Sequence, residues 1–202
     1  MTSHKTVVVT GFGPFGEHKV NASWQAVQEL EQIGLLNNVS LITKEMPVVY
    51  DDVKTIVPSI WKDQKPQLVI HVGVSGEARE ITLEQLARNS GYCKHDIQKK
   101  TPQSECCVDD GDECLQTKFD LQKVCDVING ANDKLKAIIS TDPGRYLCEF
   151  SYYLSLHQNC SAAIFVHVPP IGSPYTAAEL ANGLRIIIQC LLEQQEEFKE
   201  NS

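Results

Sequence analysis

The chain has 202 residues, of which 42% are hydrophobic and 22% are charged, and its formal net charge is -8 at pH 7. This length and composition are typical of a globular protein, and we expect residues 1–202 to form a single domain with a sizeable core. The acidic charge argues against a nucleic-acid partner, because phosphate backbones are bound by clustered basic faces.

Two further features of the sequence bear on the cellular compartment of the protein. The apolar run near the N-terminus stops after three valines, which is too short for a signal peptide. The longest apolar helical stretch, Leu184 to Leu192, is too short to span a bilayer. We therefore expect a cytoplasmic protein without membrane contact, whose eight cysteines stay reduced rather than form disulfides.

Short apolar runs rich in Val and Ile are predicted to be strands. They comprise residues 6–12, 39–46, 67–74, 136–140 and 162–168. Their apolar residues are continuous rather than alternating with polar ones. Such continuity is typical of strands that are covered on both faces in a parallel sheet.

Helical patterns lie between these strands. The first begins after Asn21, a favourable N-cap, and ends at Gly34. Its apolar face comprises Trp24, Val27, Leu30 and Ile33. Further helices are predicted at roughly 51–63, 119–129, 146–158 and 176–199. The alternation predicts an α/β fold, namely a three-layer α/β/α sandwich with a twisted, mostly parallel central sheet.

Ligands of such sheets bind beyond the carboxyl ends of the strands. Segments that follow predicted strands are therefore expected to meet at that edge, and they are 11–16, 73–76, 142–148 and 167–170. Residues 90–118 break the alternation, and we expect them to form an irregular excursion or flap near the site.

A zinc site in the 90–118 segment is one hypothesis for its polar character. The potential ligands are Cys93, His95, Cys106, Cys107 and Cys114. Zinc sites usually repeat a C-x2-C or H-x3-H spacing, which this segment lacks, and adjacent cysteines chelate poorly. We therefore expect no metal, and the thiols are interpreted as exposed or packed side chains.

The run GFGPFG, Gly11 to Gly16, matches the dinucleotide fingerprint G-x-G-x-x-G after a strand. That fingerprint requires a helix to open at once, so that its amides can meet a pyrophosphate. Here Pro14 interrupts the motif and the first good N-cap comes five residues after Gly16, which argues against a nucleotide. Phe12 and Phe15 either pack into the core or face a pocket as an apolar clamp for a flat ligand.

Cys148 differs from the other cysteines in its local context. A predicted strand ends at Ser140, the turn residues Asp142, Pro143 and Gly144 follow, and a helical pattern begins directly afterwards. Cys148 is thus expected in the first turn of a helix, where free amides and the positive end of the dipole favour a thiolate and can bind an oxyanion. A cysteine packed against the sheet is an equally good interpretation of these residues alone.

A nucleophilic cysteine needs a base and a group that orients the base. His167 closes an apolar strand, whereas His71 lies before the end of its strand and is expected to be packed in the sheet. Glu84 lies among apolar residues, and a buried carboxylate needs a partner such as a histidinium. Glu84, Cys148 and His167 form a chemically sensible set, but the sequence pattern leaves it one of several.

At these residues the chain resembles the cysteine-peptidase family of pyroglutamyl-peptidase I (peptidase family C15), in its animal form. Two long motifs carry the resemblance, GVSGEAREITLEQLARN (73–89) and IISTDPGRYLCE (138–149). Further similarity runs from VVVTGFGPFGEHKVNASW through QLVIHVGVSG and CVDDG to FVHVPP and PYTA, so that it covers nearly the whole chain.

The resemblance implies a role for each candidate residue. Cys148 would be the nucleophile, His167 the general acid and base, and Glu84 the group that orients the imidazole. Phe12, Phe15 and Tyr146 match aromatic positions that enclose the pyroglutamyl ring in relatives.

The resemblance also implies that the sandwich is of the phosphorylase/hydrolase-like type. It further implies an activity, namely the removal of an N-terminal pyroglutamyl residue from peptides. It implies no metal, no organic cofactor and no obligate protein partner. A catalytically inactive module that binds pyroglutamyl peptides is the alternative. The chain departs from the family pattern at Gln85, where Lys or Arg is usual, and at Pro143, where a small residue is usual. We expect these departures to affect rate or local rigidity rather than the type of reaction.

Overall fold

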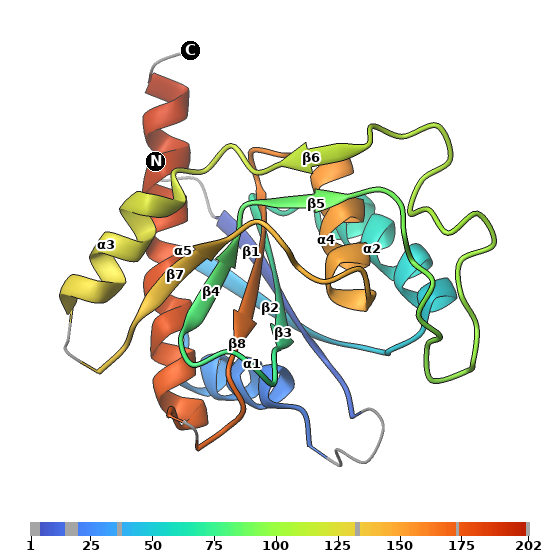
Figure 1. Cartoon of the computed structure of the whole chain (residues 1–202). Coiled ribbons are helices and arrows are strands. Elements are labelled where there is room, and N and C mark those ends of the chain that lie inside the picture. The colour runs from blue at the N-terminus through green and yellow to red at the C-terminus, as the bar shows by residue number, and fades with distance from the viewer. Residues whose placement is uncertain (1–4, 15–19, 36–37, 132–133, 173, 201–202) are drawn as a thin grey trace.

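The computed structural model describes residues 5–14, 20–35, 38–131, 134–172 and 174–200 (Figure 1). The elements in chain order are β1 (Lys5–Phe12), α1 (Ala22–Ile33), β2 (Val39–Met46), α2 (Tyr50–Gln64), β3 (Leu68–Val74), β4 (Ile81–Glu84), β5 (Leu86–Arg88), β6 (Cys114–Gln116), α3 (Leu121–Ala131), β7 (Ala137–Ser140), α4 (Leu147–Gln158), β8 (Ala163–Val168) and α5 (Ala177–Glu200). Each predicted strand and helix is present, and β4, β5 and β6 are additional.

The main sheet has the strand order β2-β1-β3-β8-β4-β7. Strands β1, β2, β3 and β8 run parallel to one another, whereas β4 runs antiparallel to β8 and parallel to β7. The prediction of a mostly parallel sheet is confirmed, and β4 and β7 are the strands that run the other way.

Helices cover both faces of this sheet (Figure 1). Helices α1, α3 and α5 share one apolar core with the sheet, and α2 and α4 share another on the opposite face. Side chains alternate between the two cores, because successive residues of a strand point to opposite faces. Val7 and Val9, for example, pack with α1 and α5, whereas Val8 packs with α2. The three-layer sandwich is therefore confirmed.

Helix α1 begins and ends where the sequence predicts. The side chain of Asn21 accepts a 3.0 Å hydrogen bond from the amide of Ser23, which satisfies a donor that the helix itself cannot. Gly34 follows with φ of 68°, a left-handed conformation that favours glycine, and its amide donates to the carbonyl of Leu30. The predicted apolar face is buried at Val27 and Leu30, but Ile33 is 39% exposed.

The expectation that all strand ends meet at one edge needs a correction at β7. Because β7 runs antiparallel to β8, its carboxyl end at Ser140 lies at the opposite edge from the carboxyl ends of β1, β3 and β8. The segment 141–146 runs back along the molecule, and α4 then starts beside the carboxyl ends of the other strands (Figure 1). Cys148 thus reaches the predicted edge through this return segment.

The 90–118 segment is largely irregular, as expected, and packs against α2 and α4. Its short strand β6 pairs with β5, and its aromatic contacts come from neighbouring helices. The hydroxyl of Tyr50 donates to the carbonyl of Lys94 at 3.1 Å, and that of Tyr153 donates to the carbonyl of Asp112 at 2.6 Å. Such bonds hold the segment next to the helix that carries Cys148.

Candidate active site

Cys148 lies in the first turn of α4, as the sequence predicts. The first amide that bonds within the helix is that of Phe150, which donates to the carbonyl of Tyr146 at 2.9 Å. The amides before it, including that of Cys148, have no acceptor inside the helix and carry the positive end of the helix dipole. This position suits both a thiolate and a nascent oxyanion.

The turn before Cys148 is held by a neighbouring carboxylate that the sequence analysis missed. Arg145 has φ of 50°, a left-handed conformation that is uncommon outside glycine. The fully buried carboxylate of Glu149 accepts hydrogen bonds from the amide of Arg145 at 2.7 Å and from the amide of Arg88 at 2.8 Å. Glu149 therefore ties the turn to strand β5, and its one sequence signal is the i,i+4 pair with the guanidinium of Arg145.

Glu84 and His167 are brought together by the pairing of β4 with β8. Thr82 lies opposite His167, and Glu84 lies opposite Phe165. Because residues two apart share a face, Glu84 and His167 are diagonal neighbours on the face that α4 covers. The Oε1 atom of Glu84 accepts a 2.8 Å hydrogen bond from Nδ1 of His167, which leaves Nε2 for the sulfur of Cys148.

The surroundings of His167 favour its charged form. Burial alone would lower the pKa of His167, but hydrogen bonds to Cys148 and Glu84 and the charges of both groups outweigh it and raise the pKa to about 10. The Oε2 atom of Glu84 is buried and has no hydrogen-bond partner among the described residues. The arrangement can therefore hold a thiolate and an imidazolium side by side.

Gly73 leaves room for the side chain of Cys148. It lies next to His167 in the parallel pairing of β3 with β8. A Cβ at Gly73 would be 2.8 Å from Sγ of Cys148 and 2.7 Å from Cζ of Phe165. Such contacts are too close for real Cβ atoms, so glycine is needed here for steric reasons.

A small cavity of about 80 Å³ adjoins Cys148, and we call it the Cys148 cavity. Its lining residues are Phe12, Asn21, Val48, Val74, Tyr146, Leu147 and Cys148. Two of the predicted ring-contacting aromatics, Phe12 and Tyr146, are thus beside the predicted nucleophile, and the third, Phe15, is outside the described residues. Tyr146 is oriented by a 3.1 Å hydrogen bond from its hydroxyl to the carbonyl of His95, in the 90–118 segment.

Some lining residues of the Cys148 cavity were not predicted. Asn21 is already explained by its capping role, and its side chain also donates to the carbonyl of Gly13 at 3.1 Å. Val48, Val74 and Leu147 belong to apolar patterns that any buried residue could produce. Nothing in the sequence separates them from core residues.

His71 is packed inside the sheet, as expected, and does not reach the cavity. It is fully buried and makes hydrogen bonds with Oγ1 of Thr10 at 2.7 Å and with Oγ of Ser155 at 2.6 Å. The indole nitrogen of Trp61 also donates to Oγ of Ser155. Burial lowers the pKa of His71 to about 3, so this imidazole stays neutral.

Gly11 has a packing role in the GFGPFG run. A Cβ at Gly11 would lie 2.9 Å from both the carbonyl oxygen of Ser23 and Cα of Trp24, so its hydrogen allows α1 to approach β1. Helix α1 begins at Ala22 and not directly after the glycines, which is unlike the dinucleotide fingerprint.

Other features of the described residues offer no comparable chemistry. No group of three or more His, Cys, Asp or Glu side chains among them is arranged to hold a metal ion. Likewise, none of the helices described has the length and apolar character of a bilayer span.

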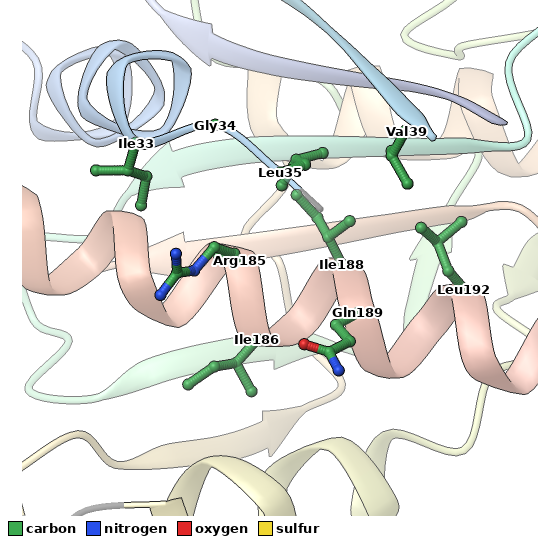
Figure 2. Close-up of a pocket in the computed structure, with 9 residues that line it drawn as sticks. All are labelled: Ile33, Gly34, Leu35, Val39, Arg185, Ile186, Ile188, Gln189 and Leu192. Carbon is green, nitrogen blue, oxygen red and sulfur yellow. The ribbon is translucent and has the colours of Figure 1, made fainter. Parts of the chain in front are cut away.

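A larger cavity of about 320 Å³ lies between the end of α1, β2 and α5 (Figure 2). The described residues that line it include Ile33, Leu35, Val39, Ile188 and Leu192, and none is a nucleophile or a general base.

The chain is similar in sequence to known peptidases. The sequence profile of the pyroglutamyl peptidase family matches residues 5–184. The chain is 49% identical to human pyroglutamyl-peptidase 1 over 199 residues, which cover 98% of this chain and 95% of the human protein. It is 50% identical to the mouse pyroglutamyl-peptidase 1 over 188 residues, or 93% of this chain and 90% of the mouse protein.

Solved structures show the same fold. A mutant pyrrolidone carboxyl peptidase from the hyperthermophile Pyrococcus furiosus superposes with a TM-score of 0.84 at 25% identity, over 94% of this chain and 99% of that chain. The pyrrolidone carboxyl peptidase from Thermococcus litoralis has a TM-score of 0.85 at 21% identity, over 96% of each chain. Since the family profile spans most of the sequence and the animal relatives are about half identical, this chain belongs to the pyroglutamyl peptidase family.

Proposed function

We propose that this protein is a cysteine peptidase that hydrolyses the bond after an N-terminal pyroglutamyl residue, with Cys148, His167 and Glu84 as its catalytic residues. The observation that carries the proposal is the continuous line of contacts from Glu84 through His167 to Cys148 at the edge of the Cys148 cavity.

The first half of the reaction forms a thioester. The Cys148 thiolate attacks the carbonyl carbon that joins the pyroglutamyl ring to the next residue, and a tetrahedral oxyanion results. When the C–N bond breaks, His167 gives its proton to the departing amine. Glu84 keeps the imidazole oriented through Nδ1 and stabilises its positive charge.

The second half releases the ring. Neutral His167 takes a proton from a water molecule, whose oxygen attacks the thioester carbonyl. The C–S bond then breaks, which frees pyroglutamate and restores the thiolate–imidazolium pair. In both halves the free amides of the first turn of α4, including that of Cys148, stabilise the oxyanion that forms on the carbon bonded to sulfur. The scheme uses no metal and no organic cofactor.

The Cys148 cavity suits the lactam ring of the substrate. The ring is small, flat and uncharged, and the cavity is lined mainly by the aromatic and aliphatic side chains of Phe12, Tyr146, Val48 and Val74. A glutamate residue with free charges would lose its hydration there without gaining a counter-ion. We therefore expect peptides that begin with pyroglutamate to be substrates and those that begin with glutamate to be rejected.

The proposal includes the compartment. A thiolate nucleophile must stay reduced to act, and all eight cysteines are free thiols in the structure. This chemistry fits a reducing compartment such as the cytoplasm.

A fluorogenic pyroglutamyl-coumarin amide tests the activity. Wild-type protein should release the fluorophore, iodoacetamide should stop the release, and Cys148→Ala should be inactive. Cys160→Ala is the matched control, because Cys160 is also partly buried but lies just beyond the other end of α4. Full activity of Cys148→Ala would contradict the assignment. Binding of pyroglutamate without any turnover by the wild type would instead indicate the inactive binding module.

A further inference from the structure

A second cavity adjoins the Cys148 cavity on the side of strand β8, and we call it the Pro170 cavity. Its volume is about 320 Å³, and it is lined by Val20, Asn21, Ala22, Gln25, Val74, Gly76, Pro170 and Ile171. It shares Asn21 and Val74 with the Cys148 cavity. A ligand in the Cys148 cavity that extends past these two residues would therefore enter the Pro170 cavity.

The walls of the Pro170 cavity continue the strands that carry the catalytic groups. Gly73 faces the Cys148 sulfur, and the next residue, Val74, pairs with Val168, the residue after His167. The strand pairing extends one step further, because the amide of Ser75 donates to the carbonyl of Val168 at 3.0 Å. Pro170 lies three residues after His167 along the chain.

The reaction fixes which part of a substrate points this way. The pyroglutamyl ring fills the Cys148 cavity, and the scissile carbon must touch the Cys148 sulfur. The departing amine must lie close to His167, because this residue protonates it. The residue that carries the amine therefore leaves the site on the side of β8, where the Pro170 cavity opens.

The described residues that line the Pro170 cavity are uncharged. Among the described residues that form it, Val20, Val74, Pro170 and Ile171 present apolar surface, and the polar ones, Asn21 and Gln25, carry neutral amides. Val20 is 57% exposed and Ile171 is 38% exposed, which is apolar surface that a bound side chain would cover. A charged side chain placed there would lose part of its hydration without meeting an opposite charge among these described residues.

We propose that the Pro170 cavity is the subsite for the residue that follows pyroglutamate, and that it favours uncharged, apolar side chains at that position. This inference rests on the proposed function, because it needs the ring to be held in the Cys148 cavity.

Pyroglutamyl dipeptides and pyroglutamyl amide provide the test. The amide releases ammonia and places no side chain in the Pro170 cavity, so it serves as the reference substrate for every variant. For each protein, kcat/KM of pyroglutamyl-leucine amide and pyroglutamyl-aspartate amide is divided by kcat/KM of pyroglutamyl amide. We expect the leucine ratio of the wild type to exceed the aspartate ratio by about tenfold, the discrimination that a buried methylene or two can give.

Charge substitutions make the test specific to the cavity. Ile171→Arg should raise the aspartate ratio relative to the leucine ratio by about two- to fivefold, the range of a partly exposed ion pair. Gln25→Arg should act in the same direction from the opposite wall and replaces the first variant if that one does not fold. Ile138→Arg is the control, since Ile138 is 47% exposed on β7 and does not line the cavity.

The outcomes separate the two proposals. The subsite is overturned if the wild type gives equal ratios for leucine and aspartate, or if both arginine variants leave the ratios unchanged. In either case, hydrolysis of pyroglutamyl amide still supports the proposed activity. If the wild type hydrolyses neither the amide nor the dipeptides, the proposed function fails and the subsite fails with it.

Discussion

The hydroxyl of Tyr152 donates a 2.8 Å hydrogen bond to the backbone carbonyl of Glu84, so the helix that carries Cys148 is bonded directly to strand β4, which carries the carboxylate of Glu84. Tyr152 lies one helical turn after Cys148 and is fully buried. Burial raises the pKa of Tyr152 well above its usual value, so the hydroxyl remains a protonated donor. This bond relates the position of the sulfur to that of the carboxylate.

Tyr152→Phe should therefore lower both stability and turnover. The Glu84 carbonyl would lose its side-chain donor in a buried environment, which costs about 1–3 kcal/mol of unfolding free energy. We expect kcat to fall several-fold with little change in KM, because the relative position of Glu84 and Cys148 is loosened. Urea unfolding and steady-state kinetics measure the two effects. Tyr153→Phe is the control, since Tyr153 donates to the carbonyl of Asp112 in the 90–118 segment and does not touch β4. A kcat that falls equally in both variants would contradict this role.

Gly73→Ala should separate catalysis from folding. The added methyl would meet Cys148 Sγ at 2.8 Å and the end of the Phe165 ring at 2.7 Å, so the sulfur or the ring must move. Displacement of a reacting atom by about 1 Å can cost about 100-fold in rate, and we expect kcat/KM to fall by about that factor. Gly130→Ala is the control, because Gly130 is exposed on α3 and lines neither the Cys148 cavity nor the Pro170 cavity, and no heavy atom of the described residues lies within 4 Å of a Cβ built there. Near-wild-type activity of Gly73→Ala would show that the sulfur occupies another position during the reaction.

Glu84→Gln should change the pH dependence of the reaction as well as its rate. The charge and hydrogen bond of Glu84 help to raise the pKa of His167 to about 10, even though burial opposes it. In the proposed mechanism the imidazolium protonates the departing amine, so wild-type kcat/KM should persist well above pH 6.5 and fall as pH rises through the raised pKa. In Glu84→Gln this basic limb should move to lower pH, and kcat should drop by about 10²- to 10⁴-fold.

The control for Glu84→Gln is Glu77→Gln, because Glu77 is an exposed residue in the loop between β3 and β4. Its pH profile should match the wild type. An unchanged basic limb in Glu84→Gln would mean that the carboxylate does not act on His167.

The buried His71 should make the protein sensitive to acid. Its folded pKa of about 3 is below its ordinary value of 6.5, so the unfolded chain binds a proton that the folded chain does not. The stability from this group is therefore present above pH 6.5 and is lost as pH falls toward 3. Between pH 7 and pH 5 the loss amounts to about 2 kcal/mol of unfolding free energy.

Urea unfolding of the wild type and His71→Gln at both pH values isolates this contribution. The pH-dependent loss should be about 2 kcal/mol smaller in the variant, whereas His157→Gln, at an exposed position on α4, should keep the wild-type loss. If His71→Gln does not fold, titration of the wild-type imidazole by nuclear magnetic resonance decides the matter. A His71 resonance that titrates near pH 6.5 would contradict the prediction.

The elements that the sequence predicted are those with long local signals. Strands β1, β3 and β8 are apolar along most of their length because helices cover both faces, and α1 carries its own start and stop at Asn21 and Gly34. Strands β4, β5 and β6 have only 4, 3 and 3 residues, which is too short for a periodic pattern to appear. Their formation depends on partners far away in the chain, which local propensity does not encode.

The candidate site likewise has features that local sequence signals predicted and features that depend on distant residues. The place of Cys148 in the first turn of a helix followed from a turn signal and a helical pattern that are adjacent in the chain. The burial of Glu84 was also expected from its apolar neighbours. That Glu149 ties the turn to Arg88 of β5, and that Tyr152 reaches the carbonyl of Glu84, could not be predicted, because each of these contacts joins residues about 60 or more positions apart.

The sequence by itself determined the composition of the layers, the chemical groups of the site and, through its resemblance to known peptidases, the family. Only the tertiary structure decided how those groups meet. The direction of β4 is the clearest case, because a parallel strand at that place would have set Glu84 opposite a different residue of β8. The antiparallel register sets Glu84 diagonally beside His167, and strand register is specified by side-chain burial over the whole sheet and not by any single segment.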